Sequence, residues 1–494
     1  MVLAIDQDSL AKMATSWWIT NAVLPVVHEG RLHLAFAGAR DDRAASWAAW
    51  RLDLPAPEIP VLEGCDEDLA HPMAVLRGQE ASDHRGGLLG QLAEDELAVS
   101  EGSSVDEIRR KSQSEPVVKL VDHVIDEALR DGATDIHVEP DDEGVAVRFR
   151  RDGMLREFLV LPSWVQASLT SRLKILAELD IAEKRLPQDG RIQRQWKGET
   201  LDIRVSTLPT RMGEKVVLRL LRQTASVLDL RSVGMPYSVR TAFEHLCDRP
   251  QGMVFVTGPT GSGKSSTLYA ALQRLLPRAI NITTIEDPSE YRLKGANQVQ
   301  ILEKAGLGFA EALRSILRQD PDVILVGEIR DAETAGIAVQ AAQTGHLVFS
   351  TLHTNDSAGA VTRLADLGVP RFLVASAVQG ILAQRLVRRV CPSCAERGAP
   401  SAQERELLAN YGPLPESVAI ARGCPACDGA GYRGRVGIFE LLTMDDTLRE
   451  AIVRGVSDGE IRSLASLRPL VHDGIAKAAE GQTTLEEVLR VGLR

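Results

Sequence analysis

Hydrophobic and polar positions follow two different periods along the chain, and the changes of period divide it into parts. Residues 1–80 contain two short apolar runs, at 23–27 and 31–37, which predict a hairpin that turns at His28-Glu29-Gly30. Residues 81–114 are rich in Gly, Ser, Asp and Glu and hold few large apolar residues. This composition predicts a flexible linker with room for one short helix.

A second domain is expected over 115–225. Apolar residues recur at helical spacing from Glu115 to Gly132, and the glycine is a natural stop for that helix. The period then changes to two, which predicts strands joined by tight turns at 151–153 and 197–199, with a helix over 163–179 between the two hairpins. The pattern indicates an α/β layer with many arginines on its strands.

Strands and helices alternate in the third part, 235–385, which predicts an open, mostly parallel sheet with crossover helices. Helices are expected near 309–319 and from 331 onward. Ligands of such sheets bind at the carboxyl ends of the strands. The expected strands are MVFVT at 253–257, NITTIED at 281–287, DVILVGE at 322–328 and LVFSTL at 347–352.

The first of these strands ends in the pattern G-x-x-x-x-G-K-S, and a helical pattern follows it. Glycines allow the backbone to wrap a phosphate, and the helix N-terminus adds positive potential. The lysine can reach the β and γ phosphates of ATP, and the last serine can ligate Mg²⁺. The predicted nucleotide site consists of Gly258, Pro259, Thr260, Gly261, Ser262, Gly263, Lys264 and Ser265.

Ionisable residues follow the neighbouring strands of the same sheet. Glu328 is the candidate for orienting or activating the attacking water, and a plain charged strand end is the alternative. Carboxylates at the end of the second strand can order water around Mg²⁺ or act as a base, or can simply cap the chain. Two histidines bracket the fourth strand, where a phosphate sensor and a structural role are both open. These candidates are Glu286, Asp287, Glu290, His346 and His353.

Phosphoryl transfer often requires an arginine supplied across an interface. Arg204 and Arg219, on strands of the second domain, are the candidates, with Arg191 less favoured. An ordinary solvated face is the alternative for each of them. Their use in catalysis would imply an oligomer whose active sites lie between domains.

Four cysteines form two C-x-x-C pairs separated by 29 residues. Each such turn offers two sulfurs to one metal, so the set predicts a tetrahedral Zn²⁺ site. Because all four positions are thiolates, the site would be structural rather than catalytic; two redox pairs are the alternative. The ligands are Cys391, Cys394, Cys424 and Cys427.

Charge is distributed unevenly over the 494 residues, whose net charge is −11. Residues 1–110 carry 19 Asp and Glu against 9 Lys and Arg, whereas residues 148–222 carry 16 Lys and Arg against 9 Asp and Glu. This separation predicts different tasks for the two regions. An acidic chain without interleaved basic and aromatic residues does not favour nucleic acid as a partner. The sequence also lacks a signal-peptide pattern and any run of 18 apolar residues, so a location in the cytoplasm is expected.

These motifs together resemble the type II secretion and type IV pilus assembly ATPases. The resemblance covers about 115–440 and is carried by ATDIHVEP, RLPQDGR, DIRVSTLPT, GPTGSGKSSTLY, TTIEDPSE, RSILRQDPDVILVGEIRD, TGHLVFSTLHTN and LVRRVCPSC. It implies a RecA-like P-loop motor domain at 235–385 preceded by a PAS-like domain. It also implies a zinc module at 386–432, a helical cap at 433–494 and a homo-hexameric ring that hydrolyses ATP with Mg²⁺.

The resemblance further implies a motor that acts on an inner-membrane partner, docked through residues 1–113, to assemble pilin-like subunits. The short acidic amino-terminal region favours type II secretion over type IV pilus extension. A nucleic-acid translocase and a nucleotide-gated scaffold with little turnover are the remaining alternatives. The complete phosphate loop and Glu328 argue against the scaffold, and the acidic charge argues against the translocase.

Overall fold

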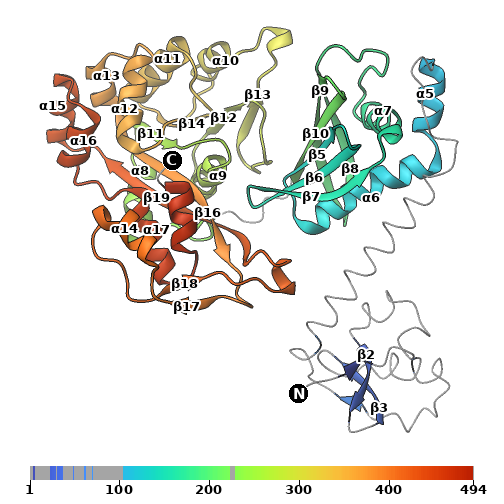
Figure 1. Cartoon of the computed structure of the whole chain (residues 1–494). Helices are drawn as coiled ribbons and strands as arrows, with labels where there is room; N and C mark the ends of the chain where they lie inside the picture. The colour runs from blue at the N-terminus through green and yellow to red at the C-terminus, as the bar shows by residue number, and fades with distance from the viewer. Residues whose placement is uncertain are drawn as a thin grey trace.

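The computed structural model describes residues 104–222 and 229–492 and, toward the amino terminus, only residues 4–5, 23–28, 31–36, 48, 61–62 and 69. Figure 1 shows the two large described parts side by side, the first in cyan to green and the second in green to red. Of the expected linker 81–114, residues 81–103 lie outside the described residues. Among the described helices, none has the length and apolar character needed to cross a bilayer.

A small sheet with the order β1-β2-β3-β4 lies in the amino-terminal part. The predicted hairpin is confirmed, because β2 (Val23–His28) pairs antiparallel with β3 (Arg31–Phe36), from Val23 opposite Phe36 to His28 opposite Arg31. Short strands β1 (Ala4–Ile5) and β4 (Val61–Leu62) flank it.

The second domain begins with α5 (Val105–Ser112) and α6 (Glu115–Asp131). Helix α6 ends where its sequence predicts, since Gly132 adopts φ 73, a left-handed conformation that glycine adopts without a Cβ penalty. Helix α5 lies inside the expected linker 81–114 but packs on α7, and its Ile108 is buried. The folded domain therefore begins about ten residues before the expected start.

Six antiparallel strands form the sheet of this domain in the order β7-β6-β5-β10-β9-β8. The 3-10 turn Ser163–Val165 and α7 (Gln166–Leu176) occupy the position of the expected helix, and α6 and α7 cover the sheet with apolar side chains. Both predicted hairpin turns are confirmed, at Asp152-Gly153 and Lys197-Gly198. The strands are β5 (Asp135–Pro140), β6 (Val145–Arg151), β7 (Met154–Leu161), β8 (Gln188–Trp196), β9 (Glu199–Thr210) and β10 (Gly213–Arg222).

The third part is built on a seven-stranded sheet with the order β13-β12-β14-β15-β11-β16-β19. All neighbours are parallel except the edge pair β16·β19, which is antiparallel. The predicted mostly parallel α/β sheet is therefore confirmed. Its strands are β11 (Gly252–Thr257), β12 (Ile282–Glu286), β13 (Asn297–Gln300), β14 (Val323–Val326), β15 (Leu347–Leu352), β16 (Val378–Val390) and β19 (Tyr432–Thr443).

Helices cover both faces of this sheet, so its strands are apolar on both sides rather than alternating. Along β11, Met253 and Phe255 face one core, and Val254 and Val256 face the other. The first core holds α10 (Phe309–Ile316), α11 (Ala332–Gln343), α12 (Ser357–Asp366) and α13 (Arg371–Ala377). The second holds α8 (Tyr237–Cys247) and α9 (Lys264–Leu275).

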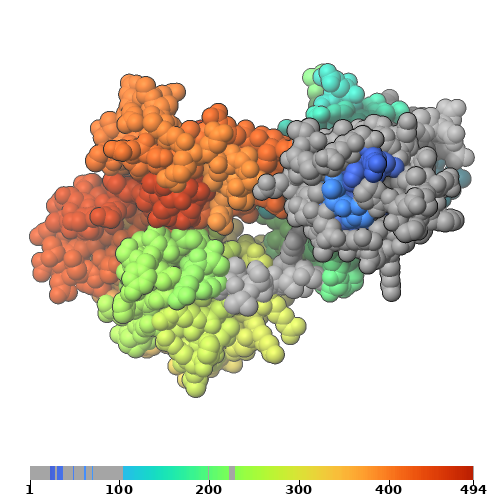
Figure 2. All heavy atoms as spheres, turned by 90° about the horizontal axis from the view of Figure 1, so that it is seen from below, coloured from blue at the N-terminus to red at the C-terminus, as the bar shows by residue number. Residues whose placement is uncertain are grey.

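The tetracysteine segment is an excursion between the last two strands of the sheet, β16 and β19. It contains β17 (Glu396–Gly398), α14 (Ala402–Leu407) and β18 (Val418–Ile420). Short helices complete the chain as expected, and Figure 2 shows this orange-to-red part covering one side of the green and yellow half. They are α15 (Asp446–Arg454), α16 (Asp458–Leu464), α17 (Leu470–Ala479) and α18 (Leu485–Gly492).

Candidate nucleotide site and tetracysteine centre

The loop between β11 and α9 has the backbone geometry that a phosphate site requires. Gly258, Gly261 and Gly263 have φ values of 149, 78 and 88, which side chains rarely adopt. A Cβ on Gly258 would lie 2.3 Å from the carbonyl oxygen of Gln384, so only glycine fits there. The Ser262 hydroxyl is buried in this loop and has no hydrogen-bond partner among the described atoms. The loop thus offers a close backbone approach and an unsatisfied polar group, both of which suit a bound phosphate chain.

Lys264 is the first residue of α9, and its amine folds back over the loop. Its Nζ donates to the carbonyl oxygens of Gly258 at 2.8 Å and Pro259 at 3.1 Å. Burial lowers the pKa of Lys264 to about 8, and the charges of Glu328 and Glu290 partly oppose this shift. The amine is therefore held among carbonyl groups that a phosphate oxygen could replace.

Glu286 closes β12 inside the protein rather than facing open solvent. Its carboxylate accepts hydrogen bonds from the hydroxyl groups of Tyr269 and Thr284 and from the Gln298 amide. A carboxylate with both oxygens already paired acts through its charge and through the residues it positions. Its predicted catalytic role stays a prediction.

Glu290 lies close to Ser265, the predicted Mg²⁺ ligand, whose hydroxyl favours the charged form of this carboxyl. Surrounding protein atoms raise the pKa of Glu290, although its side chain keeps access to solvent, and the Ser265 hydroxyl opposes the rise. Ser265 and Glu290 are thus neighbours at the edge where a metal-bound phosphate would lie.

Glu328 follows β14 and Gly327, and it lies on the same edge as Lys264. Its Oε1 pairs with Arg330 Nη2 at 2.6 Å, and its Oε2 lies 3.7 Å from His353 Nε2. Partial burial and the charge of Lys264 lower the pKa of His353, so this imidazole is mostly neutral near pH 7. Asp287 is near enough to raise the pKa of Arg330, after the larger effect of Glu328.

His346 is not brought to this edge. His346 precedes β15, whereas His353 follows that strand. The carbonyl oxygen of His346 accepts a hydrogen bond from the N–H of Gly252 at the start of β11. Its Nδ1 lies 2.9 Å from the carbonyl oxygen of Ala341. Since parallel strands place their starts together, His346 lies at the opposite edge of the sheet from the phosphate loop. The two histidines that bracket the strand in sequence therefore do not share a site in one chain.

The candidate arginines form a row across the sheet of the second domain. Arg204 pairs directly opposite Arg219 on one side and opposite Arg191 on the other. Like charges in register repel one another, so such a row favours an anion nearby. Burial and the charge of Arg191 lower the pKa of Arg204, while Asp202 and Glu290 oppose this. Arg219 also reaches Asp135, with Nε 3.1 Å from its Oδ1.

Gln384 supports the phosphate loop, and the sequence analysis did not single it out. It is 1% exposed, and its Oε1 accepts from the Thr267 hydroxyl at 2.7 Å. The pairing of β16 beside β11 brings it under the loop, and no local pattern predicts that pairing. Arg330 was also missed, although its position two residues after Glu328 could have indicated it.

The four cysteines converge as predicted. Their sulfur atoms all lie within 4.8 Å of one another, and the pairs 391–424, 394–427 and 424–427 are 3.9, 3.8 and 3.8 Å apart. Zinc bound tetrahedrally at about 2.3 Å from each sulfur requires sulfurs about 3.8 Å apart, so the donor set fits Zn²⁺.

Backbone groups support the same centre. The N–H groups of Cys424 and Gly431 each lie 3.2 Å from the sulfur of Cys427. Burial alone would raise the pKa of Cys427, but these hydrogen bonds bring it down to about 7. Within residues 104–222 and 229–492, no other group of His, Cys, Asp or Glu side chains lies close enough together to hold a metal ion by itself.

Comparisons with known proteins agree with this geometry. The Type II secretion system ATPase E of Vibrio cholerae is 48% identical over 406 residues, which cover 82% of this chain and 81% of that protein. The Type IV pilus assembly ATPase PilB of Myxococcus xanthus is 46% identical, covering 81% of this chain and 72% of its own length. Among solved structures, the pilus retraction motor PilT with bound ADP has a TM-score of 0.52 and 28% identity, covering 75% of this chain and 96% of that one.

A family model described as Type II/IV secretion system protein matches residues 110–490. The match spans the arginine-bearing domain, the seven-stranded sheet, the tetracysteine segment and the terminal helices. The chain therefore belongs to the type II/IV secretion system protein family.

Proposed function

We propose that this chain hydrolyses ATP and works as the motor of a type II secretion system. The observation that carries the proposal is the meeting of Lys264, Ser265, Glu290 and Glu328 at one edge of the sheet, around a loop in which only glycine fits at position 258. The similarity to a type II secretion ATPase over most of both chains supports the assignment to this system.

The loop of residues 258–265 would bind the phosphates of ATP through its backbone N–H groups, and Lys264 would neutralise the β and γ phosphates. Ser265 would hold Mg²⁺ together with phosphate oxygens and water, and the ion would supply charge neutralisation at the γ-phosphate. Glu290, which lies close to Ser265, would put a carboxylate near those waters. The described carboxylates at this edge do not form a metal cluster by themselves, which suits an ion that arrives with the nucleotide.

Glu328 would orient the attacking water by accepting its proton or hydrogen bond. Arg330 and His353 flank its two oxygens and would keep the carboxylate pointing along the edge of the sheet. The arginine row of β8, β9 and β10 would stabilise charge on the transferred phosphoryl group, from the same chain or a neighbour in a ring.

Replacement of Glu328 tests the hydrolytic part of the proposal. Glu328→Gln should leave the affinity for ATP within about threefold and lower turnover by about 10²- to 10⁴-fold, because the water loses its general base. Glu333→Gln is the matched control, since Glu333 lies five residues further along the chain, on α11, and pairs with Arg314 of α10. Turnover close to that of the unaltered protein would favour the nucleotide-gated scaffold.

Type IV pilus extension remains the second candidate, because a pilus assembly ATPase is 46% identical over a similar share of the chain. Both systems would use the same nucleotide chemistry. Deleting the gene for this chain in its host distinguishes the two functions. Loss of exported protein with intact pili supports secretion, whereas loss of pili supports extension.

A further inference from the structure

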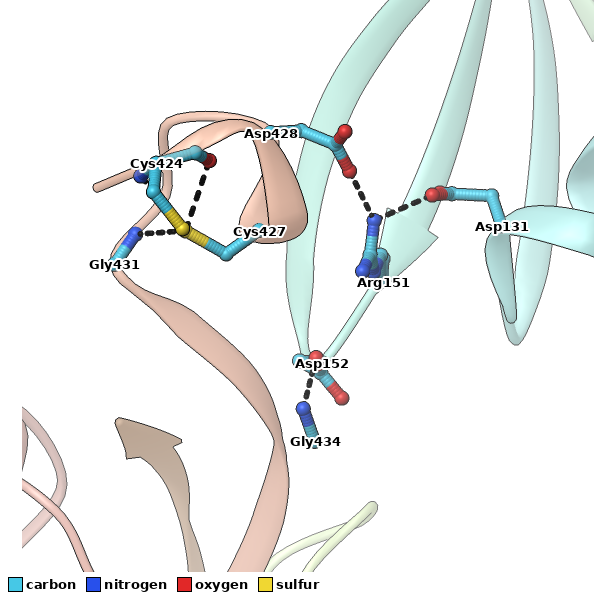
Figure 3. Close-up of polar contacts among 8 residues, drawn as sticks. All are labelled: Asp131, Arg151, Asp152, Cys424, Cys427, Asp428, Gly431 and Gly434. Carbon is cyan, nitrogen blue, oxygen red and sulfur yellow. Dashed lines mark hydrogen bonds and ion pairs between the residues drawn. The ribbon is translucent and has the colours of Figure 1, made fainter. Parts of the chain in front are cut away.

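The turn between β6 and β7 lies against the tetracysteine module, here meaning residues 391–431 (Figure 3). Arg151, the last residue of β6, extends between two carboxylates. Its Nη1 lies 2.5 Å from Oδ1 of Asp131, at the end of α6, and 2.7 Å from Oδ2 of Asp428. Asp428 directly follows the cysteine at 427, so one arginine joins the second domain to the metal-binding module.

Asp152, the next residue in the turn, contacts the start of β19. The N–H of Gly434 donates to its Oδ2 at 2.9 Å, and Arg435 Nε lies 3.6 Å from its Oδ1. Arg151 thus pairs with an acidic residue of the module, and Asp152 pairs with a basic residue at the start of β19. The two contacts fix both the position and the orientation of the turn.

The position of Asp428 depends on the cysteine turn itself. Asp428 has φ 52 and lies within a turn closed by hydrogen bonds from the N–H groups of Cys427 and Gly429 to the carbonyl oxygen of Cys424, at 3.1 and 3.0 Å. A metal bound to the sulfurs of Cys424 and Cys427 would fix the same turn. Holding those sulfurs therefore holds the carboxylate that meets Arg151.

The contact also bears on the arginine row. Strands β6 and β7 belong to the same sheet as β8, β9 and β10, which carry Arg191, Arg204 and Arg219. A sheet covered by packed helices moves as one body, so fixing one of its turns limits where the arginines can lie. A few exposed ion pairs change the equilibrium between the docked and the undocked domain only several-fold, which suits a contact that opens and closes.

We infer that the tetracysteine module is a docking platform for the arginine-bearing domain. Asp428 and the start of β19 hold the β6–β7 turn, and the metal-bound cysteine turn keeps Asp428 in place for this contact. Zinc then governs the position of the arginine row without touching nucleotide. The inference rests on these contacts and on the cysteine cluster, and it does not require that the chain hydrolyses ATP.

Amide hydrogen exchange of the full-length, zinc-loaded protein without nucleotide tests the docking. Asp428→Asn keeps the size of the side chain and tolerates a positive φ, so the module should stay folded. We expect exchange about two- to fivefold faster at the β6–β7 turn and at residues 434–435 together. Glu396→Gln is the matched control, because Glu396 is 56% exposed against 63% for Asp428 and pairs with Arg422 inside the module. It should leave both segments unchanged.

Two further comparisons decide the outcome. Arg151→Gln, which removes the other side of the pair, should speed exchange at the same two segments as Asp428→Asn. Removing zinc with a chelator should speed exchange at the turn in the unaltered protein and add nothing there in Asp428→Asn. If chelation speeds exchange only within 391–431, or if Asp428→Asn leaves the turn unchanged, the module is a local structural element and the inference is wrong.

Discussion

A buried amine that must meet phosphate is sensitive to pH in a range where most lysines are not. Burial brings the pKa of Lys264 to about 8 in the nucleotide-free protein, below the ordinary value for lysine. Bound phosphates would raise that pKa, because they favour the charged form. The stabilisation of bound nucleotide is then fully present below pH 8 and is lost as the pH rises through this value.

We therefore expect ATP to bind roughly eightfold more weakly at pH 9 than at pH 7.5, the factor by which the protonated fraction of a group with a pKa of 8 falls. The measurement is the dissociation constant of a non-hydrolysable ATP analogue at constant ionic strength. Lys264→Arg is the control, since a guanidinium stays charged over this range and should give a flat profile. Equal affinity at both pH values in the unaltered protein would contradict the shifted pKa.

At the scale of elements, the arginine row follows from register. Arg191, Arg204 and Arg219 are spread over 29 positions of the chain, and only the pairing of three strands puts them opposite one another. Three guanidinium groups in register repel one another unless anions compensate them. Asp135 pairs with Arg219, the charges of Asp202 and Glu290 act on Arg204, and a bound phosphate would add a further anion.

Arg219→Ala should lower turnover by about 10³-fold and change ATP affinity less than about threefold, because its charge is required mainly in the transition state. Single-turnover kinetics on the assembled oligomer, beside analogue binding, separate the two effects. Arg148→Ala is the matched control, because Arg148 also pairs with a carboxylate of this sheet, Glu139. Unchanged turnover in a proven oligomer would leave Arg219 as a structural residue.

Features that depend on neighbouring residues were predictable from sequence, whereas features that depend on distant pairing were not. Gly132 as a helix stop, the turn at Lys197-Gly198 and the phosphate loop each follow from local chemistry. The β16·β19 pair and the position of Gln384 depend on strand order, which no short pattern encodes. His346 shows the converse limit, since closeness to a strand in the sequence does not say at which end of the strand a site lies.

The cysteine centre is an element whose stability the metal would supply. Leu408 and Val418 of the module pack with Val471 of α17 and Leu485 and Val488 of α18, so the module and the terminal helices share a core. Loss of the metal should therefore destabilise the terminal helices as well as the cysteine turns.

Metal analysis of the purified protein should give one zinc per chain. The double variant Cys391→Ser and Cys394→Ser should lose it and melt at a temperature lower by roughly 5 °C. Cys247→Ser is the contrast, because this thiol is buried in α8, away from the module, and should cost stability without losing zinc. Zinc retained by the double variant, or absent from fresh protein, would favour two redox pairs instead.

At the scale of the whole molecule, the chemistry and the expected docking region occupy different parts of the chain. The phosphate loop, the arginine row and the cysteine centre all lie within residues 104–492. The excess negative charge lies in residues 1–110, with 19 acidic against 9 basic residues. The proposed motor needs both a nucleotide cycle and an attachment to what it moves, and we propose the acidic amino-terminal region as the attachment.

A chain beginning at residue 104 should accordingly keep its affinity for the ATP analogue within about twofold, because every nucleotide contact proposed here remains. It should no longer recover the membrane partner that we expect tagged full-length protein to recover from cognate membranes, with mass spectrometry as the measurement. Recovery of an inner-membrane secretion component by the full chain alone supports type II secretion, and recovery of a pilus platform protein moves the motor to pilus extension. If the shortened chain recovers the same partner, the docking surface lies within 104–492 and the acidic region has another role.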